Sequence, residues 1–323
     1  MTINVYLDNE FCYFKSIDDI FCLVYANKKN SIIFYNIVEL KKMNEIKNSH
    51  NGLTINLRHC LDKKNYRDLL MSISVKENNV KVWNANNIEC IFNIKRSDLN
   101  DFILGCFLLQ NDYINIIIKN HSSQVMSIYN LNGNKINKIS IPDDDNNLYT
   151  FYIDSYYDNK FSKNYIITGT SKDIKSFDYN ELKLYKYYYD DVPNEEYNKR
   201  IFHVSIIVYE DDEMVKLIGT CSSGFIKIWN FHSRQLIKYI FVSNEPIYST
   251  LLWNKDFLFV GNVGNENLKL IDLKKGQIIK SYKGHENKTL TIKKINHPIY
   301  GESIISMGND FEIKLWKNIN NIF

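Results

Sequence analysis

Three residues near the end of the chain carry the groups that nucleophilic hydrolysis requires. His285, Ser306 and Asp310 supply an imidazole, a hydroxyl and a carboxylate. In a hydrolase triad the imidazole accepts the proton of the hydroxyl, and the carboxylate orients the imidazole. Because a substrate must reach the hydroxyl, such a triad has to be open to solvent. The residue types therefore raise hydrolysis as one candidate activity.

Two further stretches share features with ligand-binding motifs. Gly219 and Gly224 have the glycine spacing of a phosphate-binding loop, but Phe225 and Ile226 stand where that motif places Lys and Ser or Thr. A hairpin turn is therefore the predicted structure there. The run Asp143–Asp145 offers adjacent carboxylates, whereas calcium-binding loops alternate their ligands around a glycine. We therefore expect neither a metal nor a cofactor.

The bulk composition narrows the functional class. A net charge of +3 over 323 residues is too small to indicate nucleic-acid binding. No stretch approaches the roughly 18 apolar residues of a membrane span, and we expect no signal peptide because the first residues lack a basic start. The cysteines are scattered without paired metal-ligand spacing, which favours reduced thiols in a cytoplasmic or nuclear protein; they are Cys12, Cys22, Cys60, Cys90, Cys106 and Cys221.

The elements that would position the three residues can be predicted from the stretch 284–316. It opens with a Gly-His pair, continues with an alternating apolar strand, and passes through a second strand and a polar turn into a third strand that ends at Trp316. This unit resembles a WD repeat. The resemblance implies a buried hydrogen-bonded network that braces the blade and performs no catalysis, formed by His285, Ser306, Asp310 and Trp316.

The third strand of this unit recurs along the chain. By subtraction, the anchor residues up to Trp316 are separated by 48, 46, 48, 52, 42 and 45 residues; the earlier anchors are Tyr35, Trp83, Tyr129, Phe177, Trp229 and Ile271. Asn or Asp follows each of these six anchors, whereas Lys317 follows the last. Seven such units fill the chain, which predicts an all-β fold: a seven-bladed β-propeller of four-stranded antiparallel sheets, in a single domain over residues 1–323. Because only seven residues follow Trp316, the strand at residues 2–8 is predicted to complete the last blade.

The resemblance also implies a function. WD-repeat propellers generally serve as non-enzymatic scaffolds for protein–protein interaction, so we expect an adaptor subunit that is monomeric within a multiprotein complex and has no nucleic-acid partner. A membrane phosphoinositide-binding propeller is one alternative, although the Arg-Arg pair of such propellers does not occur in this chain. A propeller hydrolase is the other alternative, and it would require a triad open to solvent.

The charge of the loops predicts where a partner binds. In a four-stranded meander, the loops that enter a blade share a face with the turns between its second and third strands. Acidic loops enter the fourth and fifth blades, and with two turn residues they form the candidate partner-binding surface: Asp143, Asp144, Asp145, Asp190, Asp191, Ser222 and Asn309. We expect this surface to attract a basic segment of a protein partner.

Two observations leave other interpretations of the loops open. Acidic loops of this kind are often only solvated and keep a protein in solution. The opposite face is predicted to carry most of the basic loop residues, namely Lys63, Lys64, Arg67, Lys160, Lys163, Arg234, Lys274 and Lys275, although the acidic run Glu210–Glu213 lies there too. The basic face is therefore the next place to look for a partner.

Overall fold

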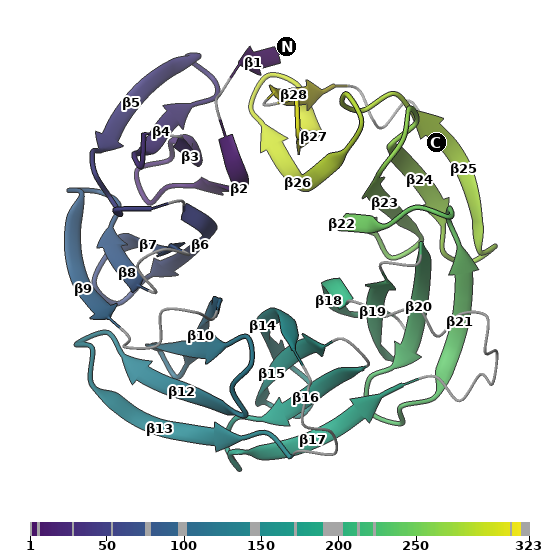
Figure 1. Cartoon of the computed structure of the whole chain (residues 1–323), viewed down its shortest axis with the longest axis horizontal. Coiled ribbons are helices and arrows are strands. Elements are labelled where there is room, and N and C mark those ends of the chain that lie inside the picture. The colour runs from purple at the N-terminus through teal and green to yellow at the C-terminus, as the bar shows by residue number, and fades with distance from the viewer. Residues whose placement is uncertain are drawn as a thin grey trace. The chain divides into compact units, whose positions relative to one another are not determined.

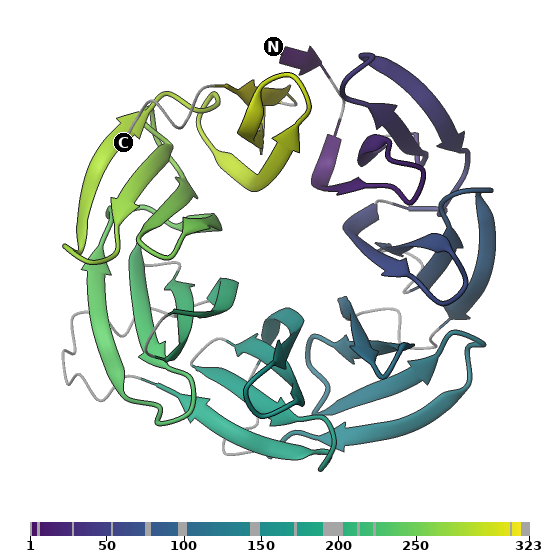
Figure 2. The ribbon, with the colours of Figure 1, turned by 180° about the vertical axis from the view of Figure 1, so that it is seen from behind.

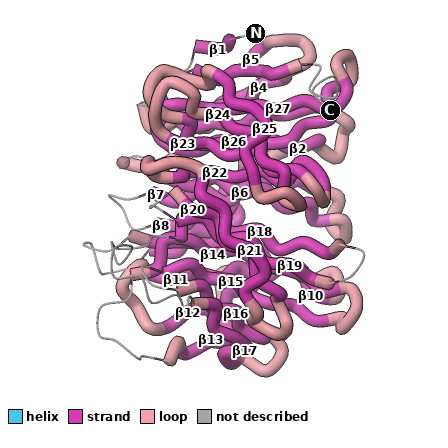
Figure 3. The backbone as a smooth tube through the Cα atoms, turned by 90° about the vertical axis from the view of Figure 1, so that its right-hand side faces the viewer, coloured by secondary structure: helices cyan, strands magenta, loops and turns pink. Residues whose placement is uncertain are grey.

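The computed structural model describes most of the chain as strands and turns. The described residues are 2–4, 7–27, 29–52, 54–74, 79–95, 102–142, 149–170, 173–189, 203–211, 214–221, 224–310 and 312–317. They form seven four-stranded antiparallel sheets and no helix. Figure 3 accordingly shows strands, loops and turns only. The predicted fold class, an all-β seven-bladed propeller of four-stranded sheets, is confirmed. Within these residues no helix is long and apolar enough to span a membrane.

Residue contacts divide the chain into two compact units. The first unit contains residues 4–144, 295–303 and 317–323, and the second contains residues 1–3, 145–294 and 304–316. The prediction of a single domain over the whole chain stays a prediction.

The first unit contains blades one to three, which follow one another along the chain (Figures 1 and 2). Blade one consists of β2 (Leu7–Lys15), β3 (Phe21–Asn27), β4 (Ile32–Asn36) and β5 (Lys41–Ile46). Blade two consists of β6 (Thr54–Asp62), β7 (Arg67–Ser74), β8 (Asn79–Asn84) and β9 (Glu89–Lys95). Blade three consists of β10 (Ile103–Gln110), β11 (Tyr113–Asn120), β12 (Val125–Asn130) and β13 (Lys135–Ser140).

The second unit contains blades four to six and most of blade seven. Blade four consists of β14 (Thr150–Asp158), β15 (Lys163–Thr170), β16 (Ile174–Asp178) and β17 (Lys183–Tyr188). Blade five consists of β18 (His203–Glu210), β19 (Val215–Cys221), β20 (Phe225–Asn230) and β21 (Leu236–Phe241). Blade six consists of β22 (Ile247–Asn254), β23 (Phe257–Asn262), β24 (Leu268–Asp272) and β25 (Gln277–Tyr282). Blade seven orders its strands as β26 (Thr289–His297), β27 (Gly301–Gly308), β28 (Glu312–Trp316) and β1 (Thr2–Asn4).

The second strand of a blade is buried on both sides because it packs against neighbouring sheets. Strand β7 is buried at seven of its eight positions, whereas β13, a fourth strand, is exposed at five of its six. Met71 and Ile73 of β7 belong to one apolar cluster with Ile116 and Ile118 of β11 in the next blade. Burial of each such side chain contributes about 1.5–3 kcal/mol. Contact between blades two and three, within the first unit, therefore supplies part of the core.

A recurring bulge and turn explain the spaced third-strand anchors. In blades one to six the pairing of third and fourth strands shifts register directly before the anchor, for example between Ile228 and Trp229. The next residue, Asn230, accepts hydrogen bonds from the N–H groups two and three positions later at 3.0 and 2.9 Å. The same side-chain turn is made by Asn36, Asn84, Asn130, Asp178 and Asp272. Lys317 needs no such turn, because the neighbour of β28 is β1 from the other end of the chain.

One predicted strand has the expected position but the wrong length. Residues 2–8 were expected to complete blade seven, and β1 does lie beside β28, but it covers only Thr2–Asn4. Leu7 already pairs with Asn27 in blade one. The backbone from Leu7 onward forms its hydrogen bonds with blade one, so it does not extend the strand that pairs with β28 in blade seven.

Candidate functional site

The four predicted network residues of blade seven are joined by hydrogen bonds. Trp316 Nε1 donates to Ser306 Oγ at 2.8 Å, and that oxygen lies 2.7 Å from His285 Nε2. His285 Nδ1 lies 2.9 and 3.0 Å from the two carboxylate oxygens of Asp310. The contacts thus link the third strand, the second strand, the loop that enters the blade and the hairpin turn. That this network braces the blade stays a prediction.

The protonation states follow from burial and from the hydrogen bonds. Burial lowers the pKa of His285 against the opposing effect of Asp310, so the ring is neutral at neutral pH. Burial by itself would raise the pKa of Asp310, but the N–H groups of Glu286 and Glu312 and the neighbouring imidazole lower it. The neutral ring therefore donates from Nδ1 to Asp310 and accepts at Nε2 from the Ser306 hydroxyl.

Close packing holds His285 in place. Asn267, fully buried, accepts a hydrogen bond from the His285 N–H at 2.9 Å and donates to its carbonyl at 2.7 Å. A Cβ at Gly284 would lie 2.3 Å from the Asn267 side-chain oxygen, and one at Gly308 would lie 2.4 Å from the His285 side chain. Glycine is therefore required on both sides of the histidine, which accounts for the Gly-His opening.

The connectivity of the network is that of a hydrolase triad, but its nucleophile is sealed. Ser306 is 0% exposed, and so is the side chain of His285. The Ser306 oxygen also accepts the Trp316 N–H. A substrate carbonyl could approach this oxygen only after the blade had opened. The arrangement forms a continuous chain of hydrogen bonds, but its hydroxyl is not accessible to a substrate.

The same blade brings three potential metal ligands together. Suitable atoms of His285, Asp310 and Glu312 lie within 4.8 Å of one another. Lys314 Nζ lies 3.6 Å from Asp310 Oδ2 and 3.2 Å from Glu312 Oε2. A metal ion would have to displace this ammonium and would meet the protonated Nδ1 of the ring. The three residues therefore suit the lysine cation better than a metal.

A second network of the same kind occurs in blade two and was missed in the sequence. His50 Nε2 lies 2.8 Å from Ser72 Oγ, which accepts a hydrogen bond from Trp83 Nε1 at 2.8 Å. Lys81 Nζ donates to the carbonyl of Ser49, as Lys314 does to Gly284 at 2.9 Å in blade seven. The turn that would carry the acidic member lies in residues 75–78, outside the described part of the chain.

The spacing of these residues could have revealed the second network. The steps from His to Ser and from Ser to Trp are 22 and 11 residues in blade two, against 21 and 10 in blade seven. The second network lacks the Gly-His opening that marks blade seven, because Ser49 stands in the place of the glycine.

Most of the predicted partner-binding surface lies outside the described residues. This applies to Asp143, Asp144, Asp145, Asp190, Asp191 and Ser222. Asn309 is described and is exposed in the turn between β27 and β28. The structure therefore places one of the seven residues, at a position accessible to a partner.

Several predicted basic residues form ion pairs within their own blade. The pairs are Arg67–Asp62, Lys163–Asp178, Lys274–Asp256 and Lys275–Asp272, at 2.9, 2.8, 3.0 and 3.9 Å. Lys64 lies over the ring of Tyr113 at 4.4 Å from its centroid. These contacts reduce the positive charge that the loops present. Of the eight predicted basic residues, only Lys274 lines a cavity between blades five and six of the second unit.

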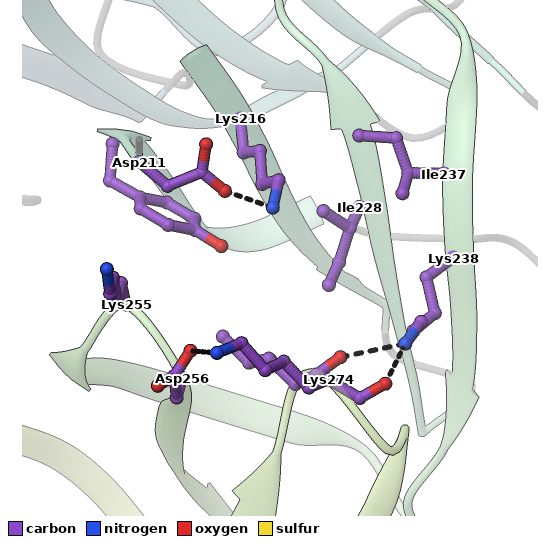
Figure 4. A pocket seen from close by; sticks show the side chains of 10 residues that line it. Asp211, Lys216, Ile228, Ile237, Lys238, Lys255, Asp256 and Lys274 are labelled. Carbon is purple, nitrogen blue, oxygen red and sulfur yellow. Dashed lines mark hydrogen bonds and ion pairs between the residues drawn. The ribbon is translucent and has the colours of Figure 1, made fainter. Parts of the chain in front are cut away.

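That cavity, of about 360 Å³, is lined by blades five and six (Figure 4). Its charged lining residues come from the β18–β19 loop, β19, β21 and two turns of blade six; they are Asp211, Lys216, Lys238, Lys255, Asp256 and Lys274. Lys238 Nζ donates to the carbonyl of Leu273 at 3.0 Å and to that of Lys274, which connects the two blades. No motif joins these short stretches, so the sequence contained no signal for the cavity.

Comparison with known proteins supports the fold of this chain but assigns it to no sequence family. Neither the protein-family models nor the curated proteins contain a match. Among solved structures, the crystal structure of Raptor from Chaetomium thermophilum is similar, with a TM-score of 0.74 and 14% sequence identity. The similarity covers 98% of this chain and 28% of that chain. It supports the propeller fold over almost the whole length of this chain.

Proposed function

We propose that this chain is a WD-repeat propeller that serves as a non-enzymatic scaffold for protein–protein interaction. The observation that carries the proposal is the sealed hydroxyl of Ser306, which is 0% exposed and bonded to both Trp316 and His285. A nucleophile must meet its substrate, whereas a structural hydroxyl only needs partners for its donor and acceptor groups.

Repetition of the network supports the same conclusion. A His–Ser–Trp arrangement occurs in blade two and in blade seven, at nearly equal spacings. A catalytic site is needed once in a chain, but a device that fastens a loop to its sheet is useful in each repeat. The repeated arrangement and the six side-chain turns after the anchors are what support assignment to the WD-repeat family.

The proposed partner is a protein, bound by a propeller that is monomeric within a larger complex in the cytoplasm or nucleus. The acidic loops around Asp143–Asp145 and Asp190–Asp191, with Ser222 and the exposed Asn309, are the proposed contact surface for a basic segment. The likeness to Raptor supports the proposal at the level of fold.

The enzymatic alternative can be tested with a fluorophosphonate probe, which labels activated serines. The native chain should show no more labelling than its Ser306→Ala variant. Labelling that disappears in Ser306→Ala would establish an open triad and refute the proposal.

The scaffold role itself can be tested by affinity purification of the tagged chain followed by quantitative mass spectrometry. At least one protein should be recovered in near-stoichiometric amount. Cross-links should join that protein to loops of the propeller. Recovery of the chain alone, under gentle salt conditions, would contradict the proposal.

A further inference from the structure

The turn between β6 and β7 in blade two holds a tyrosine in an unfavourable backbone conformation. Asp62 ends β6, pairs with Arg67 across the hairpin, and accepts a hydrogen bond from the N–H of Asn65 at 3.2 Å. The next residue, Tyr66, has a φ of 51°. A positive φ is uncommon for an aromatic residue, because the Cβ atom crowds the following carbonyl oxygen. The tyrosine is therefore unfavourable for the turn itself.

The corresponding turn of blade four shows that this shape needs no tyrosine. Asp158 ends β14 and accepts a hydrogen bond from the N–H three residues later at 3.1 Å, as Asp62 does in blade two. The position of Tyr66 is occupied there by Ser162, which has the same φ of 51°. A small side chain thus fits the turn, and the tyrosine must have another role.

Tyr66 gains no contact in the described part of the molecule that would offset this strain. Within those residues its side chain makes no hydrogen bond, ion pair or ring contact, and it is 73% exposed. Ile88 also has a positive φ, of 64°, but its side chain packs against an apolar cluster of blades one and two. Strained residues gather at binding and active sites. Because a tyrosine offers a partner a rigid ring with a polar end, Tyr66 is suited to a contact outside the chain.

Further exposed apolar side chains lie beside this turn, at the β10–β11 hairpin of blade three. Lys64 Nζ lies 4.4 Å from the ring centroid of Tyr113, which brings the two hairpins together within the first unit. Tyr113 is 64% exposed and Leu109 is 48% exposed. Leu109 pairs with Ile114, whose side chain belongs to the apolar cluster shared with blade two, so Leu109 faces that blade. Together these residues form the Tyr66 surface, which consists of Lys63, Lys64, Tyr66, Leu109 and Tyr113.

The two turns carry more positive than negative charge. Every residue of both turns is described, so the count of their charges is complete. Asp62 is engaged by Arg67, which lies 2.9 Å away. Lys63 and Lys64 form no ion pair within the described residues, and Asp112 is the other acidic residue of these turns. Two lysines against one aspartate leave a formal charge of +1. An aromatic surface with this charge is complementary to an apolar side chain flanked by carboxylates.

We propose that the Tyr66 surface binds a short acidic segment of a partner protein, in which an apolar side chain has Asp or Glu on either side. The apolar side chain packs on Tyr66 and Leu109, and the carboxylates pair with Lys63 and Lys64. This inference rests on the proposed scaffold function. Because a scaffold joins at least two proteins, a second surface that complements the proposed acidic loops is consistent with that role.

The charges favour a peptide over a nucleic acid. Single-stranded nucleic acids bind where cations follow the phosphates while the bases stack on aromatic rings. Here Asp112 stands directly before Tyr113 and places a negative charge beside the ring on which a base would stack. A peptide with one or two carboxylates needs only Lys63 and Lys64 as cations.

The test uses the whole chain and three fluorescein-labelled peptide libraries, which are degenerate outside their central positions. The central residues are Glu-Phe-Glu, Lys-Phe-Lys or Glu-Ala-Glu, and binding is followed by fluorescence anisotropy. The Glu-Phe-Glu library should bind at least about tenfold more tightly than the others, because each of the others lacks one of the two contacts. Equal binding of either other library would overturn the assignment to an acidic segment.

Tyr66→Ser introduces the residue that the matching turn of blade four already contains. It should weaken binding of the Glu-Phe-Glu library by about fivefold or more. The melting temperature should stay at or above that of the wild type, because strain is relieved and no internal contact is lost.

A matched control is the exposed Tyr157, near the end of β14 in blade four. Tyr157→Ser should leave binding unchanged. Equal weakening by Tyr157→Ser and Tyr66→Ser, or unchanged binding by Tyr66→Ser, would refute the surface as the site. A clear loss of stability in Tyr66→Ser would make Tyr66 a structural residue and would also refute the inference.

A pair of lysine variants tests the charge. Lys63→Gln with Lys64→Gln removes both positive charges and should weaken binding of the Glu-Phe-Glu library by about tenfold. Lys274→Gln with Lys275→Gln, at a turn of the second unit, makes the same change in net charge and should have no effect. Equal losses in the two pairs would indicate non-specific attraction and refute the inference.

A fluorescein-labelled single-stranded oligonucleotide distinguishes a nucleic acid from a peptide. Oligonucleotide binding that depends on Tyr66 and Lys64, without binding of the Glu-Phe-Glu library, would replace this inference with a nucleic-acid site. Failure of the peptide tests, with protein partners still recovered from cells, would refute the inference and leave the scaffold function intact. Absence of any protein partner would instead contradict the scaffold function.

Discussion

The hydrogen bond between His285 and Ser306 should contribute measurably to the stability of the chain. Ser306→Ala removes the acceptor of the Trp316 N–H and the donor to His285 Nε2. Both contacts are made by the Ser306 hydroxyl, and Ser306 is 0% exposed. Leaving a buried polar group without its partner costs about 1–3 kcal/mol, and His285→Ala should cost the same amount for the same reason. The two changes remove one shared contact, so their effects should not add.

The magnitude can be converted to a melting temperature. With an unfolding entropy of about 2.1 cal/mol/K per residue, a chain of 323 residues loses about 1.5 °C for each kcal/mol. Each single variant should therefore melt about 2–4 °C below wild type. In urea denaturation, the double-mutant cycle of His285→Ala and Ser306→Ala should give a coupling free energy of about 1–2 kcal/mol.

A matched control is available on the same strand. Ser303 is equally buried, but its hydroxyl donates to the carbonyl of Gly301 at 3.1 Å and is not part of the network. Ser303→Ala combined with His285→Ala should be additive within about 0.5 kcal/mol. A coupling between His285 and Ser306 no larger than that of the control pair would refute the network as a source of stability.

Four further predictions follow from the same contacts. The cycle of His50→Ala and Ser72→Ala in blade two should show a coupling similar to that in blade seven by urea denaturation. By the same measurement, Trp229→Ala should lower the free energy of unfolding by about 3–5 kcal/mol, because Trp229 is 1% exposed. Trp316→Ala should lower it by about 2–3 kcal/mol, less than for a fully buried tryptophan, because Trp316 is half-buried. Burial lowers the pKa of His285 in the folded chain, so the unfolded chain takes up a proton first as the pH falls. The free energy of unfolding should therefore stay at its maximum above about pH 6.5 and decrease below that pH. The decrease should be less steep in His285→Asn. Once a partner is known, stopped-flow association at low salt should be slower for the combined Asn variant of Asp143, Asp145, Asp190 and Asp191, and unchanged rates would place the partner elsewhere.

The repeat was predictable from the sequence because its signals are local. The anchors and the Asn or Asp after them lie in adjacent positions. In the structure the anchors Tyr35, Tyr129 and Phe177 each stand one residue before the end of a third strand, in β4, β12 and β16. The structure adds the reason for the pattern, since the side chain closes the turn into the fourth strand. It also explains why Lys317 departs from it.

The features that were missed depend on distant parts of the chain. The length of β1 is limited by the pairing of Leu7 with Asn27 in another blade. The cavity depends on contacts such as that of Lys238 with Leu273, 35 positions apart. The anchor type predicted a buried Trp316, but the structure leaves it half-buried at the end of β28, whose neighbour β1 comes from the other end of the chain. Periodicity contains no information about such pairings.

The native mass of the protein in a cell extract tests the central claim most directly. A scaffold subunit should elute from a size-exclusion column, coupled to light scattering and detected by antibody, at a mass well above the 38.2 kDa of the chain. The complex should persist at about 0.15 M salt, where surface charges are partly screened. Elution of all the protein at about 38 kDa would contradict the account.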